Sequence, residues 1–223
     1  MNQSKTKGNL FYLLFFTGFI ILIFNLQGYL NFRQKPLYHS EYPLTTEGTK
    51  PLAMRGGDPY IRALMRTITA SEANVEQPYH VIYGGSTVED LTAHPDRCIT
   101  IVAGPNRGNC STAAGRYQML NYVWDEKATR YHPNPNGLLW WKQYSFEPQY
   151  QDAVVYAWLS DRNAWEVDLS QLLKEGKIET VLRILSGTWT SLGYGIEPNS
   201  MSKYLPAIYQ NMLQEELILS EKS

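Results

Sequence analysis

The chain has 223 residues, 43% of them hydrophobic and 18% charged, which suits one sizeable folded domain plus a segment and excludes a disordered chain. Its formal net charge of −1 provides no basic field to gather nucleic acid, and no nucleic-acid-binding motif occurs. Aromatic residues make up 13% of the chain, a content that suits either a packed core or a cleft in which flat rings stack on sugars.

The N-terminal segment has the pattern of a membrane anchor. Residues 1–9 carry two lysines and no acid, and residues 10–24 are almost uninterrupted Leu, Ile and Phe. We expect residues 1–32 to form one transmembrane helix, because the apolar stretch approaches the ~20 residues that cross a bilayer. The lysines predict an N-terminus inside and the rest outside. A cleaved signal sequence, a releasable signal anchor and a buried core helix are the alternatives.

A linker and then a globular domain are expected after this segment. Residues 33–58 are rich in Pro, Thr and Gly with little periodicity, which predicts a flexible linker. The domain is predicted to span residues 59–223. It begins with a helix at 59–73, which has Asp58 as N-cap and Pro59 in its first turn. The apolar residues that recur at helical spacing in it are Ile61, Leu64, Met65 and Ile68.

The remaining elements predict an α+β fold, mostly helical with a small β-hairpin lobe. Alternating Tyr79, Val81 and Tyr83 before a Gly-Gly turn indicate a hairpin over residues 79–92. Residues 96–112 are expected to be loop. Helical patterns then follow at residues 112–131, 148–161, 177–190 and 200–217. We expect a cleft between the β lobe and the helices.

The two cysteines, Cys98 and Cys110, are too few for a disulfide scaffold and lack zinc-site spacing. They are either two free thiols or one disulfide. We favour the disulfide, because the anchor predicts an oxidising compartment outside the membrane.

One carboxyl group stands out as a candidate catalytic acid. Glu72 is predicted near the C-terminal end of its helix and opposite the β lobe. The partial negative charge at that helix end disfavours ionisation, and glycosidase chemistry needs a protonated carboxylic acid beside a sugar-binding groove. The alternative is an ordinary solvated glutamate.

Several short stretches carry a family resemblance across about residues 60–195. They are Thr69-Ala-Ser-Glu72, Tyr79-His-Val-Ile-Tyr-Gly-Gly85, His94-Pro95, Ser111-Thr-Ala-Ala-Gly-Arg-Tyr-Gln118, Trp124-Asp125, Gln151-Asp-Ala-Val154 and Trp189 with Gly193-Tyr-Gly195. In this order they resemble the lambda phage endolysin family, lambda lysozyme-like lytic transglycosylases. The stretch from Ser111 to Gln118 is the most specific match.

The resemblance implies a lysozyme-like fold, peptidoglycan glycan strands as substrate and Glu72 as the catalytic residue. It implies cleavage of the MurNAc–GlcNAc β-1,4 bond with formation of a 1,6-anhydro ring, a reaction that needs no second carboxylate, no cofactor and no metal. Together with the anchor, it predicts a single-pass protein of the bacterial inner membrane whose catalytic domain faces the periplasm and cell wall.

Six residues are the candidates for binding substrate in the expected cleft. They are Tyr79, Tyr83, Tyr117, Gln118, Trp189 and Tyr194. The aromatic rings would stack on sugars, and the Gln118 amide would bond an N-acetyl group. The alternative is packing of the aromatic rings in the core and capping of backbone groups by Gln118. Arg116 and His94 have structural alternatives of the same kind.

One departure from the family pattern leaves the reaction type open. Asp90 matches a family acid, but a second acid four residues later is Ala93 here. We therefore expect Asp90 to be a turn residue. The alternatives to a transglycosylase are a hydrolytic muramidase, with Asp90 or Glu89 activating water, and an inactive tether that binds the wall.

Overall fold

The helix predicted at residues 59–73 is present and central in the computed structural model. This helix, α2 (Pro59–Glu72), begins after Asp58, whose carboxylate accepts a hydrogen bond from the Tyr60 backbone N–H at 2.8 Å. Proline suits the first turn, because its missing N–H would have no helical partner there. Polar as well as apolar side chains of α2 are buried, so other elements enclose the helix on most sides.

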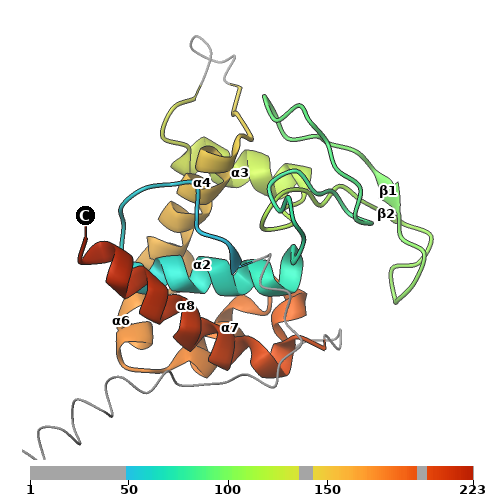
Figure 1. Cartoon of the computed structure of the whole chain (residues 1–223). Helices are drawn as coiled ribbons and strands as arrows, with labels where there is room; N and C mark the ends of the chain where they lie inside the picture. The colour runs from blue at the N-terminus through green and yellow to red at the C-terminus, as the bar shows by residue number, and fades with distance from the viewer. Residues whose placement is uncertain (1–48, 136–142, 195–199, 223) are drawn as a thin grey trace, which may run out of the picture. The chain divides into compact units, whose positions relative to one another are not determined.

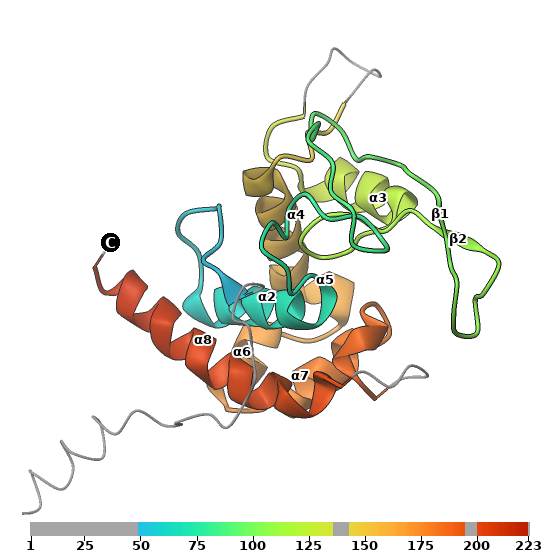
Figure 2. The same cartoon turned by 45° about the vertical axis from the view of Figure 1, so that its right-hand side comes forward.

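The structure describes residues 49–135, 143–194 and 200–222, all within the unit Thr45–Ser223. The helices that follow α2 there are α3 (Asn121–Tyr131), α4 (Pro148–Ser160), α5 (Arg162–Trp165), α6 (Leu169–Lys174), α7 (Ile178–Leu185), η2 (Thr190–Leu192), η3 (Ser202–Tyr204) and α8 (Leu205–Ser220). Figure 1 and Figure 2 show α2 between α8 and α4, and it packs against both as well as against α6 and η2.

The later helices that were predicted occur in the expected order with different bounds, whereas α5 and α6 were not predicted. The largest difference is at residues 112–131, where the first residues form a turn and α3 begins only at Asn121. Gly115 and Gln118 have positive φ angles of 72° and 45°, which a right-handed helix does not allow. A Cβ at Gly115 would also lie 2.7 Å from Cζ of Phe146, so this turn requires glycine.

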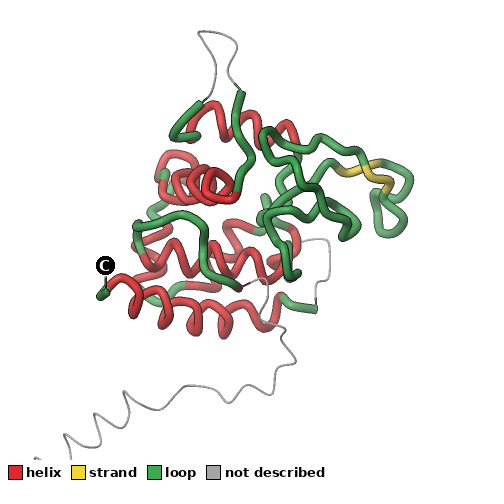
Figure 3. The backbone as a smooth tube through the Cα atoms, turned by 45° about the horizontal axis from the view of Figure 1, so that its top comes forward, coloured by secondary structure: helices red, strands yellow, loops and turns green. Residues whose placement is uncertain are grey.

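The small β lobe lies in a different segment from the one predicted. Residues 79–92 form only isolated bridges in place of the expected hairpin. The described strands are β1 (Ile99–Thr100) and β2 (Cys110–Ser111), an antiparallel pair within the predicted loop 96–112. Figure 3 shows them in yellow on a long excursion of otherwise irregular chain. The hairpin predicted there is reduced to one antiparallel bridge, Val81 with Thr87, around the Gly84-Gly85 turn, and Val81 and Ile82 are both buried.

The cysteines lie at the base of this excursion. A disulfide joins Cys98 to Cys110, the pairing favoured from the sequence, and Cys110 is itself part of β2. The bridge therefore closes the hairpin next to its two strands.

Residues 49–58, predicted to be part of a flexible linker, are instead a packed strap. Leu52 is buried, and the backbone N–H groups of Ala53 and Met54 donate to the Asp152 carboxylate at 2.6 and 3.1 Å. The carbonyl of Thr49 accepts from Arg66 Nε at 2.7 Å. Composition predicted a loop, but it did not reveal that buried charges of the helical domain need these backbone groups as partners.

Asp152 on α4 is the centre of the buried polar network beneath the strap. Its Oδ1 accepts from the Tyr117 hydroxyl at 2.6 Å, and its Oδ2 accepts from the Tyr79 hydroxyl at 2.7 Å. The Tyr79 hydroxyl also accepts from Arg116 Nη1 at 3.0 Å, so it connects a buried acid to a buried base. Arg116 in turn donates from Nε to the Thr69 hydroxyl of α2 at 2.9 Å.

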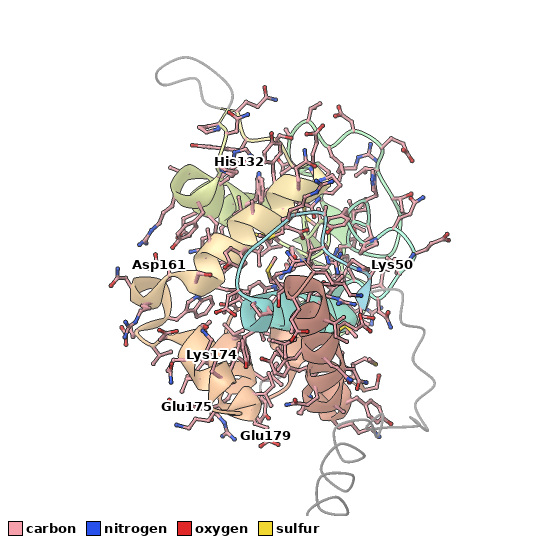
Figure 4. The ribbon with its side chains drawn as sticks, turned by 60° about the vertical axis from the view of Figure 1, so that its left-hand side comes forward. Lys50, His132, Asp161, Lys174, Glu175 and Glu179 are labelled. Atoms are coloured by element: carbon pink, nitrogen blue, oxygen red, sulfur yellow. A yellow bond between two sulfur atoms is a disulfide. The ribbon has the colours of Figure 1, made fainter. Side chains whose placement is uncertain are left out.

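Two further acids, each bonded to more than one partner, fix the outer helices. On α8, the buried Glu216 accepts from Arg66 at 3.0 Å and from Arg62 at 2.5 Å, which ties α8 to α2. Asp161, labelled in Figure 4, accepts from Arg130 at 2.6 Å and from the Tyr131 hydroxyl at 2.7 Å, which ties the end of α3 to the start of α5. Burial together with the bond to Asp161 raises the pKa of Tyr131 to about 12.

Within the described ranges, no helix is both long and apolar enough to cross a membrane. The anchor predicted at residues 1–32 lies outside the described residues. So do residues 33–48 of the predicted linker and the Trp140-Trp141 pair.

We predict that Tyr79→Phe lowers the free energy of unfolding by about 1–3 kcal/mol, because Arg116 and Asp152 each lose a hydrogen-bond partner in a buried site. Urea unfolding of the full chain measures the change. Tyr83→Phe is the matched control and should stay within about 0.5 kcal/mol of wild type, because Tyr83 lies outside this network. Equal stability of Tyr79→Phe and wild type would contradict the structural role.

Candidate active site

A cavity of about 700 Å³ opens at the C-terminal end of α2. Its walls come from the end of α2, the turn around Tyr83, the segment 111–120, the N-terminal half of α3, and the chain that runs into η2. Trp158 of α4 also lines it. The cavity therefore lies between the helices and the irregular lobe, where the sequence predicted a cleft.

Glu72 lines this cavity as the last residue of α2. The helix ends there because Ala73 leaves the helical conformation, with φ −142°, while its N–H still bonds the Thr69 carbonyl at 2.8 Å. The side chain of Glu72 is half-buried, and its Oε1 accepts a hydrogen bond from the Ser191 hydroxyl. The candidate acid is thus held at the cavity wall by a neutral hydroxyl group.

The η2 turn that carries Ser191 is itself anchored from several sides. The Trp189 indole N–H donates to the Tyr117 carbonyl at 3.0 Å, and Leu192 is fully buried. The Ser202 hydroxyl donates to the Ser191 carbonyl at 3.1 Å. Gly193 follows with φ 89°, and a Cβ there would lie 2.8 Å from Cβ of Ser202. These contacts determine where the Ser191 hydroxyl lies.

Three of the six predicted substrate-binding residues line the cavity: Tyr83, Gln118 and Trp189. Gln118 has a second task, because its Nε2 donates to the Gly115 carbonyl at 2.9 Å and to the Val81 carbonyl at 3.3 Å. These bonds maintain the turn between the lobe and α3. Gln118 therefore matches both of the readings left open from the sequence, as a cavity residue and as a cap of backbone groups.

The other three do not line the cavity, which corrects the expectation that they would. The Tyr117 ring is 1% exposed, and the Tyr79 hydroxyl is committed to Asp152 and Arg116. Burial and the neighbouring charge of Asp152 raise the pKa of both tyrosines. Tyr194 is 51% exposed, and its ring lies under the Arg183 guanidinium at 4.8 Å. Alternation and motif matching predicted that these tyrosines lie near the site. They did not predict the direction in which each ring points.

Several cavity residues were not predicted from the sequence, and the tertiary structure brings them to the wall. Trp158 stacks on Trp165 with ring centres 5.1 Å apart and lies 5.3 Å from the ring of Trp189. The Lys127 ammonium lies 4.5 Å above the Trp158 ring and pairs with Glu126 at 2.6 Å. The only feature of the sequence that pointed to Trp158 was its aromatic side chain, because the pattern of its helix does not distinguish a face toward the cavity from a face toward the core.

The acids proposed for a hydrolytic alternative lie elsewhere. Asp90 is exposed and accepts from the Thr92 N–H and hydroxyl at 2.9 and 2.7 Å, bonds that lower its pKa. This is the turn role expected of it. Neither Asp90 nor Glu89 lines the cavity, whereas Glu126 does. Arg116 and His94 make structural hydrogen bonds: Arg116 donates to the Thr69 hydroxyl, and His94 Nε2 bonds the Met119 carbonyl at 2.9 Å.

Within the part of the chain that the structure describes, no group of three or more His, Cys, Asp or Glu side chains is placed to hold a metal ion.

Comparison with known proteins gives one family. Residues 62–214 match the sequence profile of a family described as Endolysin. The endolysin of Escherichia phage lambda is 32% identical over 120 residues, which make up 52% of this chain and 64% of that protein. The match thus spans less than two thirds of the lambda protein.

Solved structures agree in fold. Bacteriophage lambda lysozyme complexed with a chitohexasaccharide superimposes with a TM-score of 0.53 at 28% identity, over 71% of this chain and 97% of that one. A second structure of lysozyme from bacteriophage lambda has a TM-score of 0.50 at 24% identity, over 73% and 97% of the two chains, and shows likeness of fold alone.

Proposed function

The chain belongs to the Endolysin family, as its motifs predicted, and we propose that it cleaves the glycan strands of peptidoglycan with Glu72 as the catalytic acid. The observation that carries the proposal is Glu72, hydrogen-bonded to Ser191, at the wall of a cavity of about 700 Å³ that aromatic residues also line. The chitohexasaccharide bound by lambda lysozyme supports a β-1,4-linked amino-sugar strand as the ligand of this cavity.

We propose that the reaction is a lytic transglycosylation. The Glu72 carboxylic acid gives its proton to the glycosidic oxygen, and the C1–O bond breaks with oxocarbenium character at C1. The MurNAc C6 hydroxyl then attacks C1, and its proton passes to the Glu72 carboxylate. A 1,6-anhydro ring forms, no water is consumed, and Glu72 returns to its starting state. One carboxyl group is sufficient for both steps.

The cavity walls suit this division of labour. Tyr83 on the irregular lobe and Tyr122 on α3 line the cavity with exposed ring surface that can contact sugars, whereas Trp158 and Trp189 are only 5% and 4% exposed and support the wall from behind. The second carboxylate on the wall, Glu126, is 66% exposed and paired with Lys127. A hydrolytic muramidase would need such a carboxylate to activate water, so Glu126 replaces Asp90 as the residue that tests this alternative.

The reaction products distinguish the candidate functions. Purified peptidoglycan treated with the full-length chain should release soluble muropeptides that are lighter by one water than reducing muropeptides, as mass spectrometry would show. Reducing ends would mean a hydrolase. Binding to the wall without any release, from a folded chain, would mean a tether and would overturn the proposal of an enzyme.

Glu72→Gln should fold normally and lose roughly a hundred- to ten-thousand-fold in turnover, because an amide does not deliver the proton. Muropeptide release, with circular dichroism as the folding check, measures the loss. Glu126→Gln is the matched control and should keep most of the activity in a transglycosylase. Wild-type turnover by Glu72→Gln would eliminate the assignment, and a large loss in Glu126→Gln would favour the hydrolase.

We also propose that residues 1–32 anchor the enzyme in the bacterial inner membrane with the domain facing the wall. The support is the charge and apolar pattern of that segment. Membranes from cells that express the full chain should retain it after a carbonate wash, as immunoblotting would show. Release into the wash would contradict a membrane-spanning anchor.

A further inference from the structure

We infer that Ser191 and Ser71 form a hydroxyl relay that hydrogen-bonds Glu72 in both of its protonation states. This inference rests on the proposed function, because it explains how one carboxyl group serves first as an acid and then as a base. Ser191 and Ser71 act through Glu72 and are therefore positioning residues.

The relay is a short chain of hydrogen bonds from the cavity into α2. The Ser191 hydroxyl lies within bonding distance of two acceptors: Oε1 of Glu72, and Oγ of Ser71 at 3.0 Å. The Ser71 hydroxyl donates its own proton to the Ile68 carbonyl at 3.0 Å. Ser71 is thus committed as a donor, and its oxygen presents only acceptor capacity to Ser191.

The single proton of Ser191 then decides between two arrangements. When Glu72 is ionised, Ser191 donates to the carboxylate oxygen. When Glu72 is protonated, the carboxylic acid donates to the Ser191 oxygen, and Ser191 turns its own proton to Ser71. Rotation of one hydroxyl group therefore satisfies both states, and no heavy atom moves. A hydroxyl is suited to this position because it both donates and accepts, whereas an ammonium or guanidinium group only donates.

The surroundings hold the relay in place. Ser71 is fixed by the helix, and Ser191 is fixed by the buried Leu192 and by the Ser202 hydroxyl on its carbonyl. A preorganised partner of this kind needs no rearrangement when the charge on the acid changes. The titratable side chains that line the cavity with Glu72 are Tyr83 from the lobe and Tyr122, Glu126 and Lys127 from α3, and they are unchanged in the variants below.

The two serines should affect the ionisation of Glu72 in opposite directions. Ser191→Ala removes a donor to the carboxylate, and because bonds to charged groups are stronger than neutral ones, the ionised state loses more. The titration midpoint of Glu72 should therefore rise by about one pH unit in this variant. Ser71→Ala leaves that bond but removes the acceptor needed when Glu72 is protonated. The titration midpoint of Glu72 should therefore fall by about half a pH unit in Ser71→Ala.

The experiment is an NMR titration of the Glu72 side-chain carboxyl carbon in the full-length chain, assigned with Glu72→Gln and recorded without substrate. The double variant Ser71→Ala/Ser191→Ala should match Ser191→Ala alone, since Ser71 acts only through Ser191. Ser191→Thr keeps the hydroxyl and should keep the wild-type midpoint. The alkaline limb of the pH–rate profile should move with each midpoint, and turnover of Ser191→Ala should fall about tenfold.

Shifts of opposite sign with a non-additive double variant would support the relay. Unchanged midpoints, shifts of the same sign or additive shifts would overturn it. If Ser191→Ala does not fold, Ser71→Ala and Ser191→Thr decide, and an unchanged midpoint in Ser71→Ala overturns the relay. Because the titration needs no substrate, its result is separate from the proposed function: anhydro products with unshifted midpoints would remove the relay alone, and shifted midpoints without products would remove the reaction alone.

Discussion

The domain depends on one buried constraint, the need of Asp152 and Arg116 for hydrogen-bond partners. An isolated charge inside a protein is costly unless it is paired and bonded, so every group around these two side chains must be placed to reach them. Their partners come from α2, from the turns at Tyr79 and Tyr117 and from the strap at residues 49–58. Segments distant in sequence are thereby held together, and a removed partner would leave a buried polar group unsatisfied.

The proposed active site lies next to this network, and the hydrogen bonds of the network position the segments that form it. Tyr117 donates its hydroxyl to Asp152 while its carbonyl accepts from the Trp189 indole, so the network extends to the segment that leads into η2. Arg116 bonds α2 one turn before Glu72, at Thr69. The end of α2 and the segment that leads into η2 are thus both positioned by contacts with the same buried charges. Tyr79, which was predicted to contact sugar and does not line the cavity, still contributes to the site because its hydrogen bonds stabilise the surrounding backbone.

The strap gives a physical reason to extend the domain beyond the family match. The match begins at residue 62, whereas residues 49–58 satisfy Arg66, Arg116 and Asp152 inside it. Backbone carbonyl and N–H groups do this work, so the strap's own side chains carry little sequence signal. A Pro- and Gly-containing stretch that reads as a linker can therefore be integral to a fold when it covers buried charge.

Three features could be predicted from local sequence patterns: the capped helix at 59–72, the helix at 148–160 that follows Glu147-Pro148, and the acid at the end of the first helix. Family motifs added the lysozyme-like fold and the choice of Glu72. Other features follow from contacts between distant segments: the turn at residues 112–120 and the short strands at 99–100 and 110–111. The same holds for the bonds of Tyr79 and Tyr117 to Asp152 and of Ser191 to Glu72. Helix caps and apolar periodicity act over a few residues, whereas the direction of a side chain depends on partners distant in sequence that no local pattern encodes.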